Sequence, residues 1–367
     1  MTATPGRPST ADVTVITVTY EAAPLVLECL DSLAQQDLDG LTMDVVVVDN
    51  ASTDGTAELV AREHPGVTVL RSPRNTGFAG GNNLALRSVT SPLVVLLNND
   101  AVAAPGAIAA LVRALRSADP AVAALSATVL LRQRFRPAGQ EDEDVVIGPD
   151  GAWSPDPEGD VTLVNSTGNV VLSSGYGTDR GWLAEASQHR PPREVFGFCG
   201  AAAAIRMSAL DEVGLFDDDF FLYYEDSDLS WRLRLAGHRI EHCPDAVVHH
   251  HHAASTREGS DLFLFHDGRN RLLMLIKDAS AGLAVRALLR FMLTTASVTV
   301  RRSAPRHQVL VRWRVLGSAA RLLPLMLRKR RAIGRAARVS RAAVETMLEP
   351  APRSAGRAYR RTPPAGR

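Results

Sequence analysis

The stretch Leu93–Asp100, LVVLLNND, constrains the fold of this 367-residue chain more than any other. Its apolar part, Leu93–Leu97, predicts a strand that is buried on both faces, as in a parallel sheet. The strand then ends abruptly in two amides and a carboxylate. Open α/β sheets bind ligands beyond the carboxyl ends of their strands, so Asp100 is a candidate ligand for a metal or a phosphate group.

Three further strands are predicted before this one. They are short runs of β-branched residues at Val13–Val18, Asp44–Val48 and Val67–Leu70. After the first run, apolar residues recur at helical spacing, which predicts a helix between the first two strands. Strands that alternate with helices predict an α/β fold in which helices flank a mainly parallel central sheet. Neither GxGxxG after the first strand nor GxxxxGK[ST] occurs, which argues against a dinucleotide-binding fold and a P-loop.

The later part of the chain is less regular. A helix is predicted at Pro105–Ser117 and a strand at Ala121–Leu131, followed by a Pro- and Gly-rich stretch over residues 133–192. We expect loops and short strands near the site in this stretch. Val195–Met207 is rich in small residues that allow close backbone approach or tight core packing, and Asp211–Arg239 is dense in acids and aromatics.

The net charge of +1 conceals an uneven distribution. From Arg286 onward there are 20 Lys and Arg against two acids, a net +18, whereas the first 285 residues hold 21 bases and 38 acids, a net −17. Arginines interrupt the apolar run after Asp278 before it is long enough to span a membrane. This mixture of arginines and apolar residues predicts a basic amphipathic helical extension that lies on an anionic membrane surface. The alternative is a basic helix packed on the body.

Four regions follow from this pattern. We expect a disordered N-terminus over 1–11, a catalytic domain over 12–277, the helical extension over 278–350 and a disordered tail over 351–367. The polar N-terminus lacks a signal-peptide core, and the three cysteines have no metal-ligand spacing. Both features predict a cytoplasmic protein, held peripherally at the inner face of the cell membrane.

Three groups of polar residues are candidates for chemistry. Asp49 and Asp100 each follow a buried strand, although either could simply cap the next helix. Glu225 and Asp226 open a predicted helix among aromatics, where burial and a neighbouring charge suit a general base, the alternative being helix-dipole stabilisation. The histidines 249–252 follow an apolar run, and alternate imidazoles of a strand would face opposite sides. One of them could complete a metal site, or all could be exposed.

Together these motifs resemble the family 2 glycosyltransferases with the GT-A fold, in particular their bacterial rhamnosyltransferase-like branch. The resemblance spans about residues 12–277 in the family's order. It rests on Val18-Thr19-Tyr20, VVVVDNASTDGT at 45–56, NTGFAGGNN at 75–83, LLNND at 96–100, GLFDDDFFLYYEDSDLSWRLRLAG at 214–237 and HHHHAAS at 249–255. Each motif alone is weak, but the set is specific.

The resemblance implies roles for individual residues. Nucleotide contacts would come from Thr19, Glu21, Asp49, Asn75, Gly77 and Asn82. Asp100 and His250 would bind Mg²⁺ or Mn²⁺ on the diphosphate, and Asp226 would be the general base beside Glu225. Supporting residues would be Asn98, Asn99, Asp228 and Arg232. Asn98 replaces the first Asp of the family's DXD motif, so the metal should bind less tightly until the nucleotide adds its charge.

The reaction implied by the resemblance is transfer of a sugar, with inversion, from a nucleotide-sugar to a hydroxyl of a glycan or polyprenyl-diphosphate-linked acceptor in cell-surface polysaccharide synthesis. The branch favours dTDP-L-rhamnose as donor, with UDP-galactofuranose or another hexose as alternatives. A non-catalytic nucleotide-sugar-binding scaffold would lack Asp100 or Asp226, yet both are present. A nucleic-acid-binding tail would interleave aromatic residues with its basic residues; the tail lacks this pattern, so no nucleic-acid partner is expected. A sugar nucleotidyltransferase would have a Gly-rich basic loop after the first strand, and this loop does not occur either.

Overall fold

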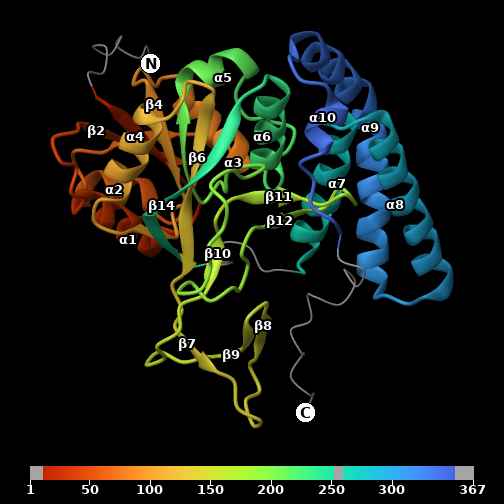
Figure 1. Cartoon of the computed structure of the whole chain (residues 1–367), viewed down its shortest axis with the longest axis horizontal. Helices are drawn as coiled ribbons and strands as arrows, with labels where there is room; N and C mark the ends of the chain where they lie inside the picture. Colours follow the sequence, from red (N-terminus) through yellow and green to blue (C-terminus); the bar gives the residue numbers. More distant parts are fainter. Residues whose placement is uncertain (1–10, 252–258, 352–367) are drawn as a thin grey trace.

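The computed structural model describes residues 11–251 and 259–351 (Figure 1). In this described part, nine strands form the central sheet in the order β3-β2-β1-β4-β13-β6-β14-β5, with β10 paired to β6. The strands of this sheet are β1 Val13–Thr19, β2 Met43–Asp49, β3 Thr68–Arg71, β4 Leu93–Leu97, β5 Ala101–Ala103, β6 Val122–Leu131, β10 Val164–Ser166, β13 Ala202–Arg206 and β14 Arg239–His250.

The first four strands are parallel to one another. β1 lies between β2 and β4, and β3 pairs with the outer edge of β2. β6 and β14 are also parallel, while β13 joins the two halves as an antiparallel strand. The predicted α/β fold with a mainly parallel sheet is therefore confirmed. The register pairs Thr19 with Asp49, so the ends of β1 and β2 lie side by side.

Helices cover both faces of the sheet because its strands are apolar on both sides (Figure 1). Val13 and Val15 share a core with α1 (Ala23–Ala34), α2 (Thr56–Glu63) and α4 (Ala107–Ser117). Ile16 and Val48 face the other way, into a core with α3 (Gly77–Leu86), α5 (Met207–Val213) and α6 (Glu225–Leu235). This alternation is the period of two expected for a strand.

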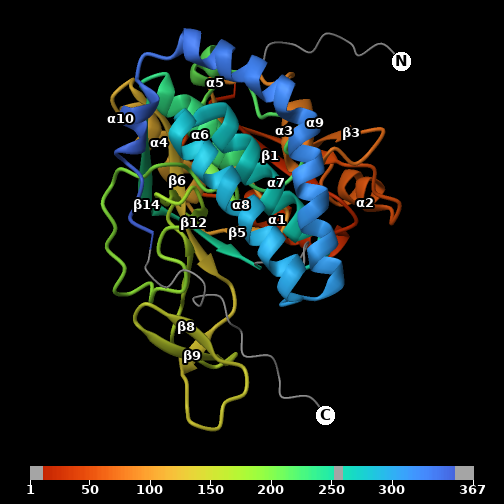
Figure 2. The same cartoon turned by 90° about the vertical axis from the view of Figure 1, so that its right-hand side faces the viewer.

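Four C-terminal helices form a further layer outside α6 (Figures 1 and 2). They are α7 (Asp261–Asp278), α8 (Ala281–Arg301), α9 (Arg306–Ala336) and α10 (Arg341–Glu345). Trp231 of α6 shares a buried core with Leu272 of α7, Phe291 of α8 and Val315 of α9. The helices that follow Asp278 are therefore packed on the body along one face.

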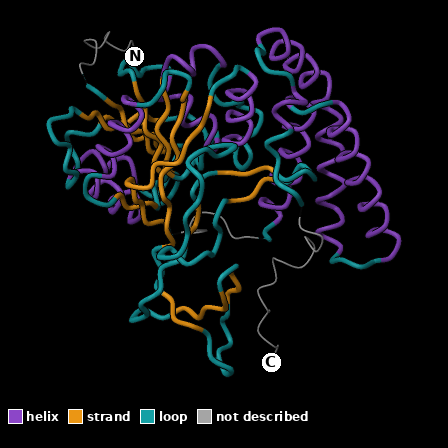
Figure 3. Tube along the Cα trace, viewed as in Figure 1, coloured by secondary structure: helices purple, strands orange, loops and turns teal. Residues whose placement is uncertain are grey.

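The irregular stretch 133–192 divides into two parts (Figure 3). β7 (Phe135–Pro137), β8 (Val146–Gly148) and β9 (Gly151–Pro155) form a small separate sheet that projects from the body. β11 (Asn169–Val171) and β12 (Gly177–Asp179) pair with each other, and the Gly177 amide donates to the hydroxyl of Tyr224 just before α6. Within this stretch, β11 and Asn165 of β10 reach the residues discussed next.

Candidate active site

Strand register brings Asp100 and His250 together. β5 pairs antiparallel with the end of β14, and His250 stands opposite Ala101, the residue after Asp100. Oδ1 of Asp100 lies 3.0 Å from Nε2 of His250, and both side chains are buried. Two residues 150 positions apart in the sequence thus make direct contact.

Asn165 of β10 orients the imidazole of His250. Its Oδ1 lies 2.7 Å from Nδ1 of the ring. Because a carbonyl oxygen only accepts hydrogen bonds, Nδ1 donates to Asn165 while Nε2 faces Asp100. Burial raises the pKa of Asp100, but the hydrogen bond and the charge of His250 outweigh burial and hold that pKa below its ordinary value.

The neighbouring histidines have other partners. His249 is half-buried on the opposite side of the strand, where burial and the charges of Arg132 and Arg134 lower its pKa. Nε2 of His251 lies 3.1 Å from a carboxylate oxygen of Glu28. His252 lies outside the described residues. Of the three described histidines, His250 is the one that meets Asp100.

Asp100 and His250 fit a divalent cation that receives its other ligands from a bound diphosphate. The pair is not a complete protein site, because in residues 11–251 and 259–351 no group of three or more His, Cys, Asp or Glu side chains is placed to hold a metal ion. The Asn98 amide lies beside the pair, with Nδ2 3.3 Å from Nε2 of His250. Oxygen and imidazole ligands suit Mg²⁺ and Mn²⁺, which commonly bind through one or two side chains plus phosphate oxygens.

The proposed nucleotide contacts lie at the ends of β1 and β2. Thr19 accepts a hydrogen bond from Asn99 Nδ2 at 3.2 Å, which ties the end of β4 to β1. The backbone amide of Ser52 donates to Asp49 at 3.3 Å, and its hydroxyl accepts from the backbone amide of Glu21 at 2.9 Å. Thr19, Glu21 and Asp49 therefore line one corner of the sheet edge.

A second loop joins this corner through Asn50, a residue that the sequence analysis did not select. Its amide donates to the carbonyl of Gly77 at 2.9 Å and accepts from the backbone of Thr76 at 3.0 Å. Asn75 is exposed and accepts from the Gly77 amide. Asn82 is buried, and within the described part of the chain its Oδ1 has no hydrogen-bond partner.

Asp226 lies at the start of α6, where four donors surround its carboxylate. One oxygen accepts from Asn169 Nδ2 at 2.7 Å and from the Gly200 amide at 3.1 Å, and the other accepts from the amide and hydroxyl of Ser227. Burial raises the pKa of Asp226, and these hydrogen bonds oppose the rise in part. A carboxylate with a raised pKa at a helix N-terminus suits proton acceptance.

Glu225 has a different environment from its neighbour Asp226. It is buried, and its Oε2 has no hydrogen-bond partner among the described residues. Burial, followed by the charges of Asp226 and Asp228, raises the pKa of Glu225 well above its ordinary value. Burial thus disfavours the charged form of both acids, whereas the hydrogen bonds from Asn169, Gly200 and Ser227 favour the charged form of Asp226.

Asp228 and Arg232 hold α6 against the preceding chain. Nε of Arg232 lies 3.0 Å from Oδ2 of Asp228, and the guanidinium donates to the carbonyls of Val213, Gly214 and Leu215. Both side chains are buried. Their contacts are structural and lie one turn away from Asp226.

One short segment connects the two halves of the site. The backbone amide of Asn98 donates to the carbonyl of Ala201 at 2.9 Å, and the backbone amide of Gly200 donates to the carboxylate of Asp226. Gly200 and Ala201 are consecutive residues, whose Cα atoms are about 3.8 Å apart. The end of β4 and the start of α6 therefore contact the same dipeptide. Asp100, His250 and Asp226 thus belong to one continuous wall.

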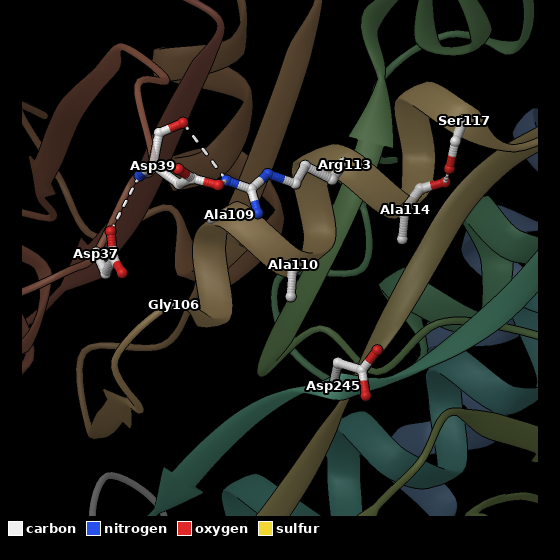
Figure 4. Close-up of a pocket in the computed structure, with 9 residues that line it drawn as sticks. All are labelled: Asp37, Asp39, Gly106, Ala109, Ala110, Arg113, Ala114, Ser117 and Asp245. Carbon is white, nitrogen blue, oxygen red and sulfur yellow. Dashed lines mark hydrogen bonds and ion pairs between the residues drawn. The ribbon is translucent and has the colours of Figure 1, made fainter.

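A separate hollow lies on the outer side of α4 (Figure 4). It has a volume of about 730 Å³ and contains none of the candidate site residues. Arg113 is paired there with Asp39. Its lining residues are Asp37, Asp39, Gly106, Ala109, Ala110, Arg113, Ala114, Ser117 and Asp245.

The family model for glycosyl transferase family 2 matches residues 14–214, and the model for glycosyl transferase family group 2 matches residues 161–272. An N-acetylglucosaminyl-diphospho-decaprenol L-rhamnosyltransferase of Mycobacterium tuberculosis is 29% identical over 256 residues, covering 66% of this chain and 76% of that protein. A low-salt glycan biosynthesis hexosyltransferase of Haloferax volcanii is 26% identical over 262 residues, covering 70% of this chain and 73% of that protein.

The structure of GalNAc-T7 with UDP, GalNAc and Mn²⁺ has a similar fold, with a TM-score of 0.52 and 15% identity over 73% of this chain and 48% of that one. Its similarity concerns the fold alone. The family model covers more than half of the present chain and includes Thr19, Asp49 and Asp100. The chain belongs to glycosyl transferase family 2, in agreement with the resemblance drawn from its motifs.

Proposed function

We propose that the protein is a metal-dependent, inverting glycosyltransferase that transfers a sugar from a nucleoside-diphosphate donor to a hydroxyl of a glycan or polyprenyl-linked acceptor. The observation that carries this proposal is the wall formed by Asp100, His250 and Asp226 through Gly200 and Ala201. In this arrangement Asp100 and His250 would hold a cation, and the Asp226 carboxylate would accept a proton. These are the two functions that displacement of a diphosphate by a hydroxyl requires.

The chain's own side chains account for binding and proton transfer. Thr19, Glu21 and Asp49 would contact the nucleoside at the corner of the sheet, and Asn75, Gly77 and Asn82 would border the donor. Asp226 would take the proton of the acceptor hydroxyl as its oxygen attacks the anomeric carbon. The bond between that carbon and the diphosphate breaks in the same step. A divalent cation held by Asp100 and His250 would neutralise charge on the departing diphosphate.

Among possible donors, we favour dTDP-L-rhamnose. The Mycobacterium tuberculosis relative is named for rhamnosyl transfer to a polyprenyl diphosphate-linked sugar, whereas the Haloferax volcanii relative is named for hexosyl transfer. UDP-galactofuranose or another hexose donor therefore remains the alternative. A binding scaffold without activity is disfavoured because both Asp100 and Asp226 are present.

The helical extension offers a surface for an anionic membrane, with the acceptor's lipid nearby. One face of α8 buries Leu283, Ala287 and Phe291. The opposite face of α8 and the start of α9 expose Val285, Leu289, Met292, Leu293, Val300, Leu310 and Trp313. Exposed arginines at 286, 290, 301, 302 and 306 accompany them. Apolar and basic side chains on one surface suit a lipid interface, with about 1 kcal/mol from each well-placed base.

Among the described helices, α8 is long and apolar enough, by length and composition, to cross a membrane. A core helix passes the same test, and α8 packs on the body through one of its faces. The proposal therefore keeps α8 on the membrane surface, with the catalytic domain over residues 12–277 on the cytoplasmic side.

The proposed function predicts distinct effects for two substitutions of the purified, full-length enzyme with Mg²⁺ and a panel of nucleotide-sugars. With the correct donor, Asp226→Asn should retain donor binding in a thermal-shift assay but lose about 100- to 10,000-fold in kcat, because proton acceptance is lost. Asp100→Ala should abolish the metal-dependent thermal shift. Asp211→Asn, at an exposed acid of α5, is the control and should behave as wild type. Turnover by Asp226→Asn at the wild-type rate would contradict the proposal, as would no binding of any donor.

A second prediction concerns the metal ligands. With a nucleoside diphosphate present, His250→Ala should abolish specific Mn²⁺ binding measured by electron paramagnetic resonance. Asn165→Ala should weaken it about tenfold or more, because the imidazole loses the partner that orients it. His249→Ala is the matched control and should leave Mn²⁺ affinity unchanged. Equal losses for His249→Ala and His250→Ala would show that the pair is not the cation site.

A third prediction concerns pH. Asn169 donates to Asp226 and lowers the pKa that burial raises, so Asn169→Ala should raise this pKa further. A base works only when it is deprotonated, so activity falls as the pH falls through its pKa. The acid limb of kcat/KM against pH should therefore move to higher pH in Asn169→Ala. An unmoved limb, or movement to lower pH, would exclude Asp226 as the titrating base.

A fourth prediction tests the membrane surface with the full-length protein. Wild type should sediment with phosphatidylglycerol liposomes, less so at high salt, and hardly with phosphatidylcholine liposomes. Leu293→Glu should reduce sedimentation because it places a charge in the apolar face. Ile147→Glu on β8 is the control, because Ile147 is 72% exposed and Leu293 is 70% exposed. Sedimentation of Leu293→Glu at the wild-type level would refute the proposed surface.

A further inference from the structure

The segment Asp217–Tyr224, directly before Glu225 and Asp226, is held in an unfavourable backbone conformation. Phe221, Tyr223 and Tyr224 have φ angles of 67°, 70° and 68°. Residues with bulky side chains rarely adopt this left-handed region, and three of them within four positions need external support. The position of Asp226 at the start of α6 depends on that support.

Helix α7 supports the middle of the segment. The amide of Asn270 is completely buried and donates to the carbonyls of Phe220, Leu222 and Tyr223 at 2.8, 2.7 and 2.7 Å. The guanidinium of Arg269 donates to the carbonyl of Asp219 at 2.7 Å. These hydrogen bonds from α7 satisfy backbone carbonyls between Asp219 and Tyr223. The side chain of Asp217, at the start of the segment, has other partners.

Both lysines of the chain, Lys277 of α7 and Lys329 of α9, meet at the start of the segment. Nζ of Lys277 lies 2.7 Å from Asp217 and also pairs with Asp228 in the first turn of α6. Nζ of Lys329 lies 2.5 Å from Asp217 and 2.6 Å from Asp219. We call these five residues the lysine cluster. It connects α9 with the first turn of α6 through three carboxylates.

The lysine cluster brings opposite charges together in a buried place. Burial would raise the pKa of Asp217, but the two ammonium groups outweigh burial and hold this pKa far below its ordinary value. Asp278 is fully buried next to Asp228, and burial together with that charge raises the pKa of Asp278 well above its ordinary value. The carboxylates of Asp217, Asp219 and Asp228 contact the side chains of Lys277, Lys329 and Arg232.

We propose that Lys329 is a positioning residue for catalysis, acting from the C-terminal extension through Asp217 and Asp219 on the segment that directly precedes Glu225 and Asp226. The inference rests on the proposed role of Asp226 as the base. The same segment also contacts the donor side of the site, because the carbonyl of Phe221 accepts from the Ala79 amide at 3.2 Å. A Cβ on Gly77 would lie 2.2 Å from that carbonyl, so the two loops fit closely.

Neighbouring bases of α9 provide a comparison. Lys329 is partly buried, whereas Arg328 is exposed and makes no contact with the segment. Arg330 donates to the carbonyls of Ile276 and Ala279 at 2.8 and 2.6 Å, so it anchors the end of α7 instead. Arg328→Met therefore removes a charge of the same sign from the adjacent position without touching the lysine cluster.

The test compares Lys329→Met, Lys329→Arg and Arg328→Met in the full-length protein, with steady-state kinetics and hydrogen–deuterium exchange. Lys329→Met should lower kcat about 10- to 100-fold, with the donor KM changed less than about threefold, because the base is misplaced while the nucleotide contacts remain. Amide exchange should rise over Phe220–Asp226 and stay unchanged in β1–β4. Lys329→Arg should recover most of the activity, and Arg328→Met should match wild type.

Unchanged exchange over Phe220–Asp226 in Lys329→Met would overturn the proposal. So would equal kinetic losses in Lys329→Met and Arg328→Met, or a rise in exchange across the whole protein, which would indicate general destabilisation. If wild type transfers no sugar but Lys329→Met still raises exchange over the segment, the proposed function fails while the support of the segment by Lys329 stands. The two failures are thus distinguishable.

Discussion

The Asp226 carboxylate is buried, and its proposed role as a base requires the charged form that burial disfavours. Burial raises its pKa, and hydrogen bonds from Asn169, Gly200 and Ser227 compensate in part. These donors come from β11, from the segment before β13 and from α6 itself. Burial, followed by the charge of Asp226, also raises the pKa of the adjacent Glu225 well above its ordinary value. Holding the Asp226 carboxylate in place requires several distant parts of the chain to converge.

The C-terminal helices belong to this convergence. The two acids that follow Arg286 both contact other parts of the chain. Glu345 accepts from the amide and hydroxyl of Ser280 at the start of α8, and the backbone amide of Glu349 donates to the carbonyl of Val171 in β11. β11 is the strand that carries Asn169. The extension therefore reaches the donors of Asp226 from one side and, through Lys329, the segment before α6 from the other. The helices that carry the proposed membrane surface thus also contact the residues around Asp226.

The fold and the ends of the strands could be predicted from the sequence. Both depend on local signals, which are the periodicity of apolar residues and the abrupt change from apolar to polar residues where a strand ends. Asp100 after β4 and Asp49 after β2 lie where the buried runs predict them. The partners Asn165 and Asn169 were missed because they lie in the irregular stretch 133–192, where no repeat sets their direction. Lys329 was not selected from the sequence, since its partner Asp217 is 112 positions away and helical periodicity carries no information about such a contact.

The most direct test of this account is the anomeric configuration of the first product that the wild-type enzyme forms. Nuclear magnetic resonance can follow the one-bond carbon–proton coupling at the anomeric carbon early in the reaction. A single displacement with Asp226 as base predicts a configuration opposite to that of the donor. Retention of the donor's configuration would require a covalent or front-face route, and would contradict the role assigned to Asp226 and to the wall that holds it.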